Sequence, residues 1–231
     1  MNEKRNVDKP ADMRSTPEKR ILVMTSVPAE KDAFLRGLRD DSRFDVRVGG
    51  VGPVTMAAST ATVLATASYD LVVNAGIAGG FVGKADIGTL AVASEIVAAD
   101  LGAQSPEGFL SLDELGFGSA RMAIDKDLAT QVTEALRAAG LIANMGPILT
   151  LSTVTGTAAT AEELTKRVPG ATAEAMEGFG VATAARQHGV PVLEIRAISN
   201  AVGPRDRSAW RIPDALKALE AASTVLAEVL R

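Results

Sequence analysis

The 231-residue sequence contains no cysteine and a single histidine, His188. The missing cysteines exclude disulfides, thiolate catalysis and cysteine-ligated metals. One histidine cannot build a multi-histidine metal site, and any histidine-dependent triad would rest on His188 alone. That residue lies at the end of a predicted helix, where contact with the terminal carbonyls is favoured over catalysis. We expect a protein with no metal ion and no organic cofactor.

Aromatic residues, excess charge and long apolar runs are also scarce. Aromatics make up 3% of the chain, so the core must be built from Ala, Val, Leu and Ile. The formal charge of −4 gives no general attraction to nucleic acid or anionic lipid. No apolar run approaches the roughly 18 uncharged residues of a membrane span. Residues 1–19 are polar and lack the apolar stretch of a signal peptide, so we expect a disordered leader on a cytoplasmic protein.

Residues 20–231 predict one α/β domain, because apolar runs of strand length alternate with segments of helical spacing. Several of the runs lack period-2 alternation, which indicates a sheet covered on both faces. The pattern therefore predicts a three-layer αβα domain around a largely parallel or mixed sheet. Three local features are also expected: a glycine turn within NAGIAGG (74–80), a loop over 105–118, and a capping box from Thr160 to Glu163.

Small and polar residues follow several of the predicted strands. In open α/β sheets, ligands bind beyond the carboxyl ends of the strands, so such residues mark a candidate crevice. We expect one crevice to be formed by Glu30, residues 74–80, residues 152–157, Met176 with Glu177, and Ser199 with Asn200.

Three motifs, NAGIAGG (74–80), EAMEGFGVA (174–182) and EIRAISN (194–200), resemble the nucleoside phosphorylase and nucleosidase superfamily. Each is weak alone, but all three occur in the family's order, and the resemblance extends over residues 19–231. Within the superfamily, residues 95–118 and 200–212 are most similar to the futalosine hydrolases. These enzymes release hypoxanthine from futalosine in one route to menaquinone.

The resemblance implies a phosphorylase/hydrolase-like αβα fold around a mixed central sheet. It also implies hydrolysis of the N-glycosidic bond of a 6-oxopurine nucleoside. A homo-oligomer, dimeric or higher, is implied as well, because relatives complete the 5′ pocket with a neighbouring subunit.

Four residues carry the main roles that the resemblance implies. Glu30 matches the position that orients and deprotonates the attacking water, and its structural alternative is a solvated helix residue. Glu177 matches the glutamate that binds the ribose hydroxyls, and Met176 matches the methionine packed on the ribose. A helix N-terminal acid and a core side chain are their alternatives.

Asn200 is the fourth residue and matches the catalytic position that contacts the departing base. Relatives that cleave 6-aminopurines have Asp there. An Asn can donate to O6 and accept from a protonated N7, which suits hypoxanthine, but it cannot supply the proton. Its alternative is to cap a turn after the strand.

The remaining candidate binding residues lie in two glycine-containing segments. Ala78 and Gly79 belong to the first motif, where glycines leave room for a nucleoside to approach the backbone. Thr155, Gly156 and Thr157 match a base-contacting stretch, although Gly156 occupies the position where an aromatic side chain is expected.

The futalosine-type substrate carries a carboxyphenyl extension on the 5′ side of the ribose. Arg205, Arg207 and Trp210 are candidates to bind it by charge pairing and stacking, with a charged surface loop as the alternative.

Other functions stay open at this point. Purine nucleoside phosphorylase and methylthioadenosine/S-adenosylhomocysteine nucleosidase are the enzymatic alternatives. GGVGP (49–53) and NAGIAGG contain no arginine to hold phosphate, which favours water as the nucleophile. A nucleoside-binding module without turnover is a more distant alternative, and no G-x-G-x-x-G follows the first strand.

Overall fold

The computed structural model describes residues 18–231, so the leader predicted over 1–19 lies, apart from its last two residues, outside the described residues. No helix in the described part is both long enough and apolar enough to cross a membrane. The helices are α1 (Pro28–Leu38), α2 (Pro53–Leu64), α3 (Lys126–Ala138), α4 (Ala158–Arg167), α5 (Gly178–Gln187) and α6 (Ile212–Val229), with a short 3-10 helix at Arg207–Ala209.

The strands form a mixed sheet that closes partly on itself. Strand β10 pairs in parallel with β3 and antiparallel with β4, and β4 continues through β8 and β9 back to β3. Strands β1 and β2 extend the sheet beyond β3, and β7 pairs with β4. The strands are β1 (Ile21–Thr25), β2 (Phe44–Val48), β3 (Leu71–Gly80), β4 (Leu90–Ala98), β5 (Gly102–Ser105), β6 (Gly108–Ser111), β7 (Arg121–Ala123), β8 (Ala143–Thr150), β9 (Ala173–Ala175) and β10 (Val192–Ala201).

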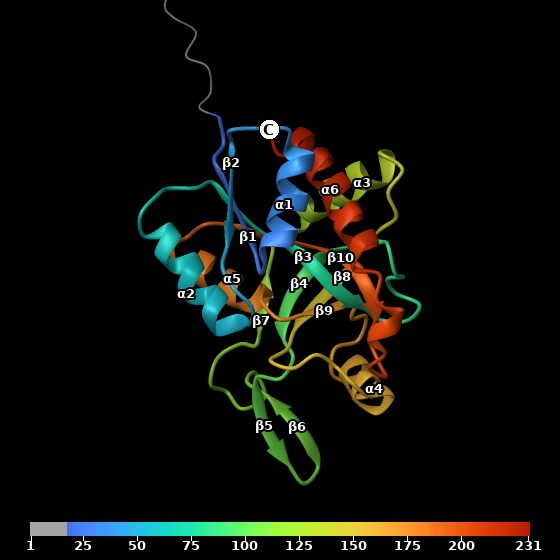
Figure 1. Ribbon diagram of the computed structural model, residues 1–231. Helices are drawn as coiled ribbons and strands as arrows, with labels where there is room; N and C mark the ends of the chain where they lie inside the picture. Colours follow the sequence, from blue (N-terminus) through green and yellow to red (C-terminus); the bar gives the residue numbers. More distant parts are fainter. Residues whose placement is uncertain (1–17) are drawn as a thin grey trace, which may run out of the picture.

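Helices cover both faces of this sheet (Figure 1). Helices α1, α3 and α6 pack on one face around Phe34, Leu136 and Leu219, which are fully buried. Helices α2 and α5 pack on the other face around Met56 and Val181. The prediction of a three-layer αβα fold with a mixed sheet is therefore confirmed.

The glycine-rich motif at 74–80 does not form the predicted turn. It is the second half of the ten-residue strand β3, and none of Gly76, Gly79 and Gly80 has a positive φ. These glycines are needed for close packing: a Cβ on Gly80 would lie 2.0 Å from the carbonyl oxygen of Ala85. The run of small residues reflects the close approach of neighbouring segments rather than a reversal of the chain.

Two further local predictions are wrong. The segment 105–118, predicted as a loop, contains strand β6, which pairs with β5 just before it as a hairpin that extends away from the sheet (Figure 1). Helix α4 starts earlier than the Thr160 capping box requires, because its N-cap is Thr157, whose hydroxyl accepts a hydrogen bond from the Thr160 N–H. Glu163 pairs with Arg167 one turn further on.

Candidate active site

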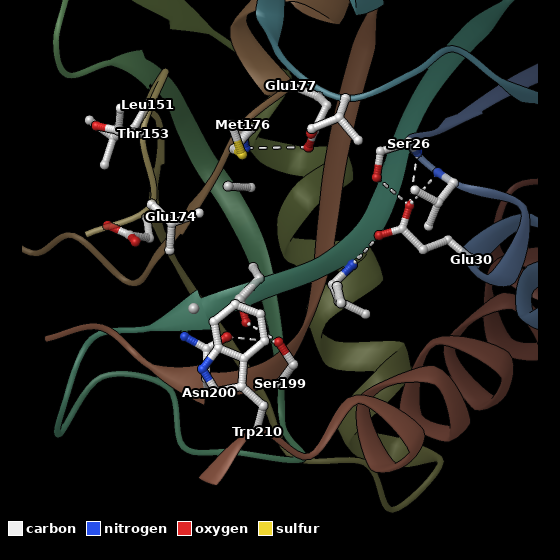
Figure 2. A pocket seen from close by; sticks show the side chains of 17 residues that line it. Ser26, Glu30, Leu151, Thr153, Glu174, Met176, Glu177, Ser199, Asn200 and Trp210 are labelled. Atoms are coloured by element: carbon white, nitrogen blue, oxygen red, sulfur yellow. Dashed lines mark hydrogen bonds between the residues drawn. The ribbon is translucent and has the colours of Figure 1, made fainter. Parts of the chain in front are cut away.

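The strand ends meet at one cavity of about 290 Å³ (Figure 2). It lies beyond the end of β1, over the last residues of β3 and β10, and beside the start of α5, near the strand ends where the sheet topology predicts a ligand. The structure brings together residues from segments far apart in the chain. Its lining includes the predicted site residues Glu30, Ala78, Gly79, Met176, Glu177, Asn200 and Trp210.

Glu30 is held rigidly at the start of α1. Pro28 opens the helix, and the Glu30 carboxylate turns back toward the preceding chain. Its Oε2 accepts hydrogen bonds from the Ser26 N–H at 2.8 Å, the Ser26 hydroxyl at 2.6 Å and the Val27 N–H at 3.2 Å. Its Oε1 accepts from the Ile77 N–H on β3 at 2.9 Å. Glu30 is buried, so the alternative of a solvated helix residue is wrong.

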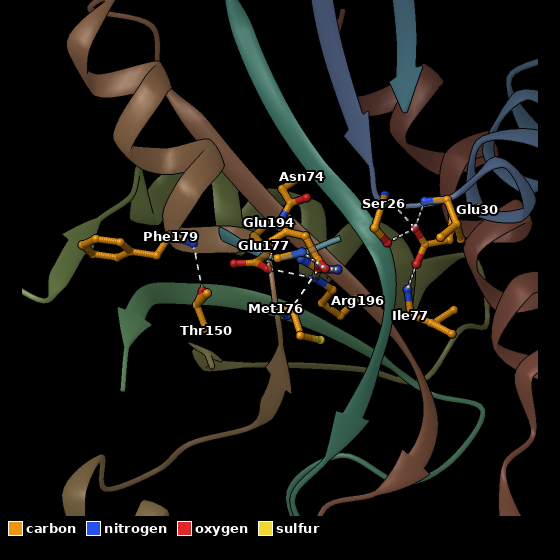
Figure 3. A network of polar contacts seen from close by, with 12 residues as sticks. Ser26, Glu30, Asn74, Ile77, Thr150, Met176, Glu177, Phe179, Glu194 and Arg196 are labelled. Carbon is orange, nitrogen blue, oxygen red and sulfur yellow. Dashed lines mark hydrogen bonds and ion pairs between the residues drawn. The ribbon is translucent and has the colours of Figure 1, made fainter. Parts of the chain in front are cut away.

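Glu177 is the N-cap residue of α5, yet its carboxylate makes no capping hydrogen bond to that helix. Instead, Oε2 pairs with Nη1 of Arg196 at 3.2 Å and accepts from the Met176 N–H at 3.3 Å. Oε1 accepts a long hydrogen bond from the Gly52 N–H at 3.4 Å. The carboxylate is thereby directed toward Arg196 rather than toward the N–H groups of its own helix (Figure 3).

Behind Glu177 lies a fully buried polar cluster. Nε of Arg196 donates to Glu194 Oε1 at 2.8 Å, and the Asn74 amide donates to the same oxygen at 3.1 Å. Burial acts to lower the pKa of Arg196, but the charges of Glu194, Glu177 and Glu30 outweigh it and raise that pKa. Burial raises the pKa of Glu194, and Arg196 offsets this only in part. The guanidinium therefore remains charged and fixes Glu177 electrostatically.

The cluster leaves some polar atoms unpaired. Asn74 Oδ1, Glu194 Oε2 and Arg196 Nη2 are buried and find no hydrogen-bond partner among residues 18–231. Such atoms are costly in a folded core. Their presence marks a place where the fold retains charge at the expense of stability, as is common at functional sites.

Gly76 allows Glu30 and Arg196 to pack closely against β3. A Cβ there would lie 2.6 Å from Glu30 Oε1 and 2.8 Å from Arg196 Nη1. Both atoms therefore pack against the backbone of Gly76, and any side chain at residue 76 would displace them.

Asn200 lies at the end of β10 with a defined amide orientation. The Ser199 hydroxyl donates to Asn200 Oδ1 at 2.9 Å, and Asn200 Nδ2 donates to the Ala201 carbonyl at 3.1 Å. The second Nδ2 hydrogen is left to donate to a ligand. Asn200 and Trp210 are drawn together at the opposite end of the cavity from Glu30 (Figure 2).

Of the predicted base-contacting stretch, none of Thr155, Gly156 and Thr157 lines the cavity. Thr155 is buried, and both its N–H and its hydroxyl donate to Glu174. Thr157 caps α4, as described above. The neighbouring residues Thr153 and Val154 line the cavity instead.

Of the three residues expected near the 5′ extension, only Trp210 lines the cavity. The Arg211 N–H donates to the Ser199 carbonyl at 2.8 Å, which holds this segment against the end of β10. The Arg205 guanidinium lies 5.3 Å from the centre of the Trp210 ring. Arg205 and Arg207 are exposed and do not line the cavity.

Sequence reasoning missed Arg196 and Glu174 as parts of the site. Each is a buried charged residue within a strand, Arg196 in β10 and Glu174 in β9, and charged residues are rarely buried unless they are paired. A charged residue inside a predicted strand was therefore the feature of the sequence that could have identified both residues.

Within residues 18–231, no group of three or more histidine, cysteine, aspartate or glutamate residues is placed to hold a metal ion.

Comparison with known proteins points to one family. Residues 30–231 match the model of the phosphorylase superfamily. The chain is 50% identical over 230 residues to futalosine hydrolase of Streptomyces coelicolor, covering 91% of this chain and 96% of the relative. It is 48% identical over 218 residues to futalosine hydrolase of Acidothermus cellulolyticus, covering 89% of each.

A solved structure shares the fold. The 5′-methylthioadenosine/S-adenosylhomocysteine nucleosidase of Helicobacter pylori, determined with butyl-thio-DADMe-Immucillin-A, aligns with a TM-score of 0.79 at 17% identity. The alignment covers 93% of this chain and 98% of that one.

Proposed function

The chain belongs to the phosphorylase superfamily, and from this premise we propose that it hydrolyses the N-glycosidic bond of futalosine. The products are hypoxanthine and dehypoxanthine futalosine, and the reaction belongs to menaquinone biosynthesis. The relatives of 50% and 48% identity, both futalosine hydrolases, support this substrate.

The observation that carries the proposal is the charge of the cavity. Its lining includes the carboxylates of Glu30, Glu174 and Glu177 and, among the described residues, no lysine or arginine. Cleavage of a ribosyl C–N bond builds positive charge on the sugar, which carboxylates stabilise. A phosphorylase must also hold an anionic phosphate, for which this lining offers no free cation. Arg196, next to the cavity, is already paired with two glutamates.

The geometry supports a division of roles along the cavity. Glu30, which lines the cavity, takes the proton of the attacking water. Glu177, fixed by Arg196, accepts hydrogen bonds from the ribose hydroxyls and opposes the charge that develops on the sugar. Met176 packs beside the ribose, and Asn200 donates to the departing base.

Trp210 is better placed for the base than for the 5′ extension. It lies near Asn200 in Figure 2, and the position where the resemblance implies an aromatic side chain is Gly156, which has none. We therefore assign Trp210 to stacking on the purine, which an indole does over a large apolar area. A role for Arg205 and Arg207 at the 5′ extension stays a prediction, since neither reaches the cavity.

The test measures base release from futalosine, inosine, 5′-methylthioadenosine and S-adenosylhomocysteine in parallel assays, with and without phosphate. We expect free hypoxanthine from futalosine, detected by chromatography, at a rate that phosphate does not change. A rate that requires phosphate would establish a phosphorylase. Nucleoside binding by calorimetry without release of any base would establish a binding module instead.

Asn200→Asp is expected to shift selectivity toward 6-aminopurines. The introduced carboxyl would face the Ala201 carbonyl, where an acceptor is satisfied only if the carboxyl carries a proton. That proton can be passed to N7 of an adenine, which an amide cannot do. We expect the ratio of kcat/KM for 6-amino over 6-oxo substrates to rise about 10- to 100-fold, the scale of one hydrogen bond to a charged group.

Asn144→Asp, a matched change on β8 outside the cavity, serves as the control for added charge. If the Asn200→Asp protein folds normally and its base selectivity is unchanged, Asn200 does not determine which base the site accepts.

We also propose that the chain forms a homo-oligomer. Val51 lines the cavity yet is 53% exposed, and Val54, at the start of α2, is 81% exposed. Apolar side chains at the rim of a ligand cavity are typical of a surface that a second subunit covers.

A further inference from the structure

Glu194 is a fully buried glutamate on β10, and it does not line the cavity. Resting on the proposed function, we propose that Glu194 is a positioning residue for the reaction. It holds the Arg196 guanidinium against Glu177 and away from Glu30. Glu177 is thereby fixed for the ribose, and Glu30 stays free to take the proton of the attacking water.

Arg196 lies between the two carboxylates that take part in the reaction. Its Nη1 lies 3.2 Å from Glu177 Oε2. The same nitrogen packs on Gly76 beside Glu30, because a Cβ on Gly76 would lie 2.8 Å from Nη1 and 2.6 Å from Glu30 Oε1. Opposite charges this close attract each other strongly in a buried site. A rotation of the guanidinium therefore decides which of the two carboxylates it engages.

Glu194 sets that rotation through the other end of the guanidinium. Nε of Arg196 donates to Glu194 Oε1 at 2.8 Å, a shorter contact than the one between Nη1 and Glu177. The N–H groups of a guanidinium form a planar fork of fixed geometry, so a hydrogen bond at Nε sets the direction of Nη1. Glu194 and Arg196 are two residues apart on β10, which places both side chains on the same face of the sheet.

Glu194 is itself held from two sides. It pairs with Asn74 in the register of β10 and β3, and the Asn74 amide donates to Oε1 at 3.1 Å. Its carboxylate also packs on the backbone of Gly178, where a Cβ would collide with both carboxylate oxygens. Gly178 is the first residue of α5 and directly follows Glu177. Glu194 therefore contacts both the cation and the segment that carries Glu177 (Figure 3).

Both hydrogen bonds end on the same oxygen of Glu194. Oε1 accepts from Arg196 and from Asn74, whereas Oε2 finds no partner among residues 18–231. Burial raises the pKa of Glu194, and a proton on Oε2 would leave both hydrogen bonds in place. The role of Glu194 therefore depends on where Oε1 lies and not on the charge of the side chain. A residue that acted through its charge would respond in the opposite way to two conservative substitutions.

The first test compares these two substitutions. Glu194→Gln keeps the length of the side chain and loses the charge, so its amide oxygen can take the place of Oε1, and we expect kcat/KM for futalosine within about 3-fold of wild type. Glu194→Asp keeps the charge but is one methylene shorter, so its carboxylate no longer reaches Nε. We expect kcat/KM to fall about 10- to 100-fold, the scale of one hydrogen bond to a charged group. Glu134→Asp, on the exposed surface of α3, is the matched control and should keep wild-type activity.

The second test uses equilibrium binding to locate the loss. The ligands are a C-nucleoside analogue of inosine, whose ribosyl bond water cannot cleave, its 2′,3′-dideoxy form, and free hypoxanthine. Glu194→Asp should bind the C-nucleoside about 10-fold more weakly than wild type does, because Glu177 is no longer held toward the ribose hydroxyls. The other two ligands lack these hydroxyls and should bind as they do to wild type. Asn74→Leu removes the donor that holds Glu194 from β3 and should give the same selective loss, which keeps the test available if Glu194→Asp does not fold.

Three results would overturn the proposal. They are a folded Glu194→Gln that loses as much activity as Glu194→Asp, a Glu194→Asp with wild-type activity, and an equal weakening of all three ligands, which a merely structural role would give. Failure of the proposed function is a separate outcome. If wild type does not cleave futalosine, the proposed function is wrong, and the binding test still measures the role of Glu194. If wild type cleaves futalosine but the variants do not differ as stated, only the role of Glu194 is wrong.

Discussion

Glu30→Gln is expected to lower kcat for futalosine by about 10³-fold, within the range that general base catalysis contributes. Glutamine has nearly the same shape but cannot take a proton from the attacking water. The Ser26 and Val27 N–H groups fix the amide oxygen on their side, so the NH2 group would face the Ile77 N–H on β3. The base-binding end of the cavity is unchanged, and we expect the Kd for hypoxanthine to stay near that of wild type.

Single-turnover release of hypoxanthine measures the loss, and calorimetric titration measures binding. Glu134→Gln, on the exposed surface of α3, is the matched control and should keep full turnover. A Glu30→Gln protein that folds and turns over like this control would show that another group activates the water.

Arg196→Met is expected to lower both stability and turnover. The change leaves Glu177 and Glu194 buried without their shared cation, and breaking a buried ion pair in this way costs about 3–5 kcal/mol. Glu177 would also lose the contact that aims it at the ribose. Denaturant unfolding at neutral pH measures the first effect, and kcat/KM for futalosine measures the second.

Arg36→Met is the matched control, because Arg36 pairs with Glu220 on the surface, where such pairs contribute about 0–1 kcal/mol. The pH dependence provides a second check. Burial raises the pKa of Glu194 in the folded protein, and removal of Arg196 takes away the interaction that lowers it. A raised folded-state pKa means that stability is lost as pH rises, so the deficit of the variant should shrink as pH falls from neutral toward about 5. A deficit no larger than that of Arg36→Met would contradict the structural role of Arg196.

Much of the fold could be predicted from the sequence because its signals are local. The apolar run starting at Ile21, Pro28 at a first helical turn and the spacing of the final helix each depend on neighbouring residues, and the structure contains all three elements. Local signals failed where distant segments decided the outcome. The glycines of 74–80 predict a turn when taken alone, but β9 and β10 pair with them and keep them extended.

The same contrast between local signals and contacts between distant segments applies to the candidate site. By itself, the sequence determined the class of fold, the family resemblance, and the identity of Glu30, Glu177 and Asn200 as candidates, because motifs keep their order and spacing along the chain. Only the tertiary structure decided that Arg196 fixes Glu177 and that Asn74 and Glu194 lie side by side on β3 and β10. The physical reason is that these effects act through a buried ion pair and the register of neighbouring strands. Both join residues that lie far apart in sequence, and neither leaves a periodic pattern in the sequence.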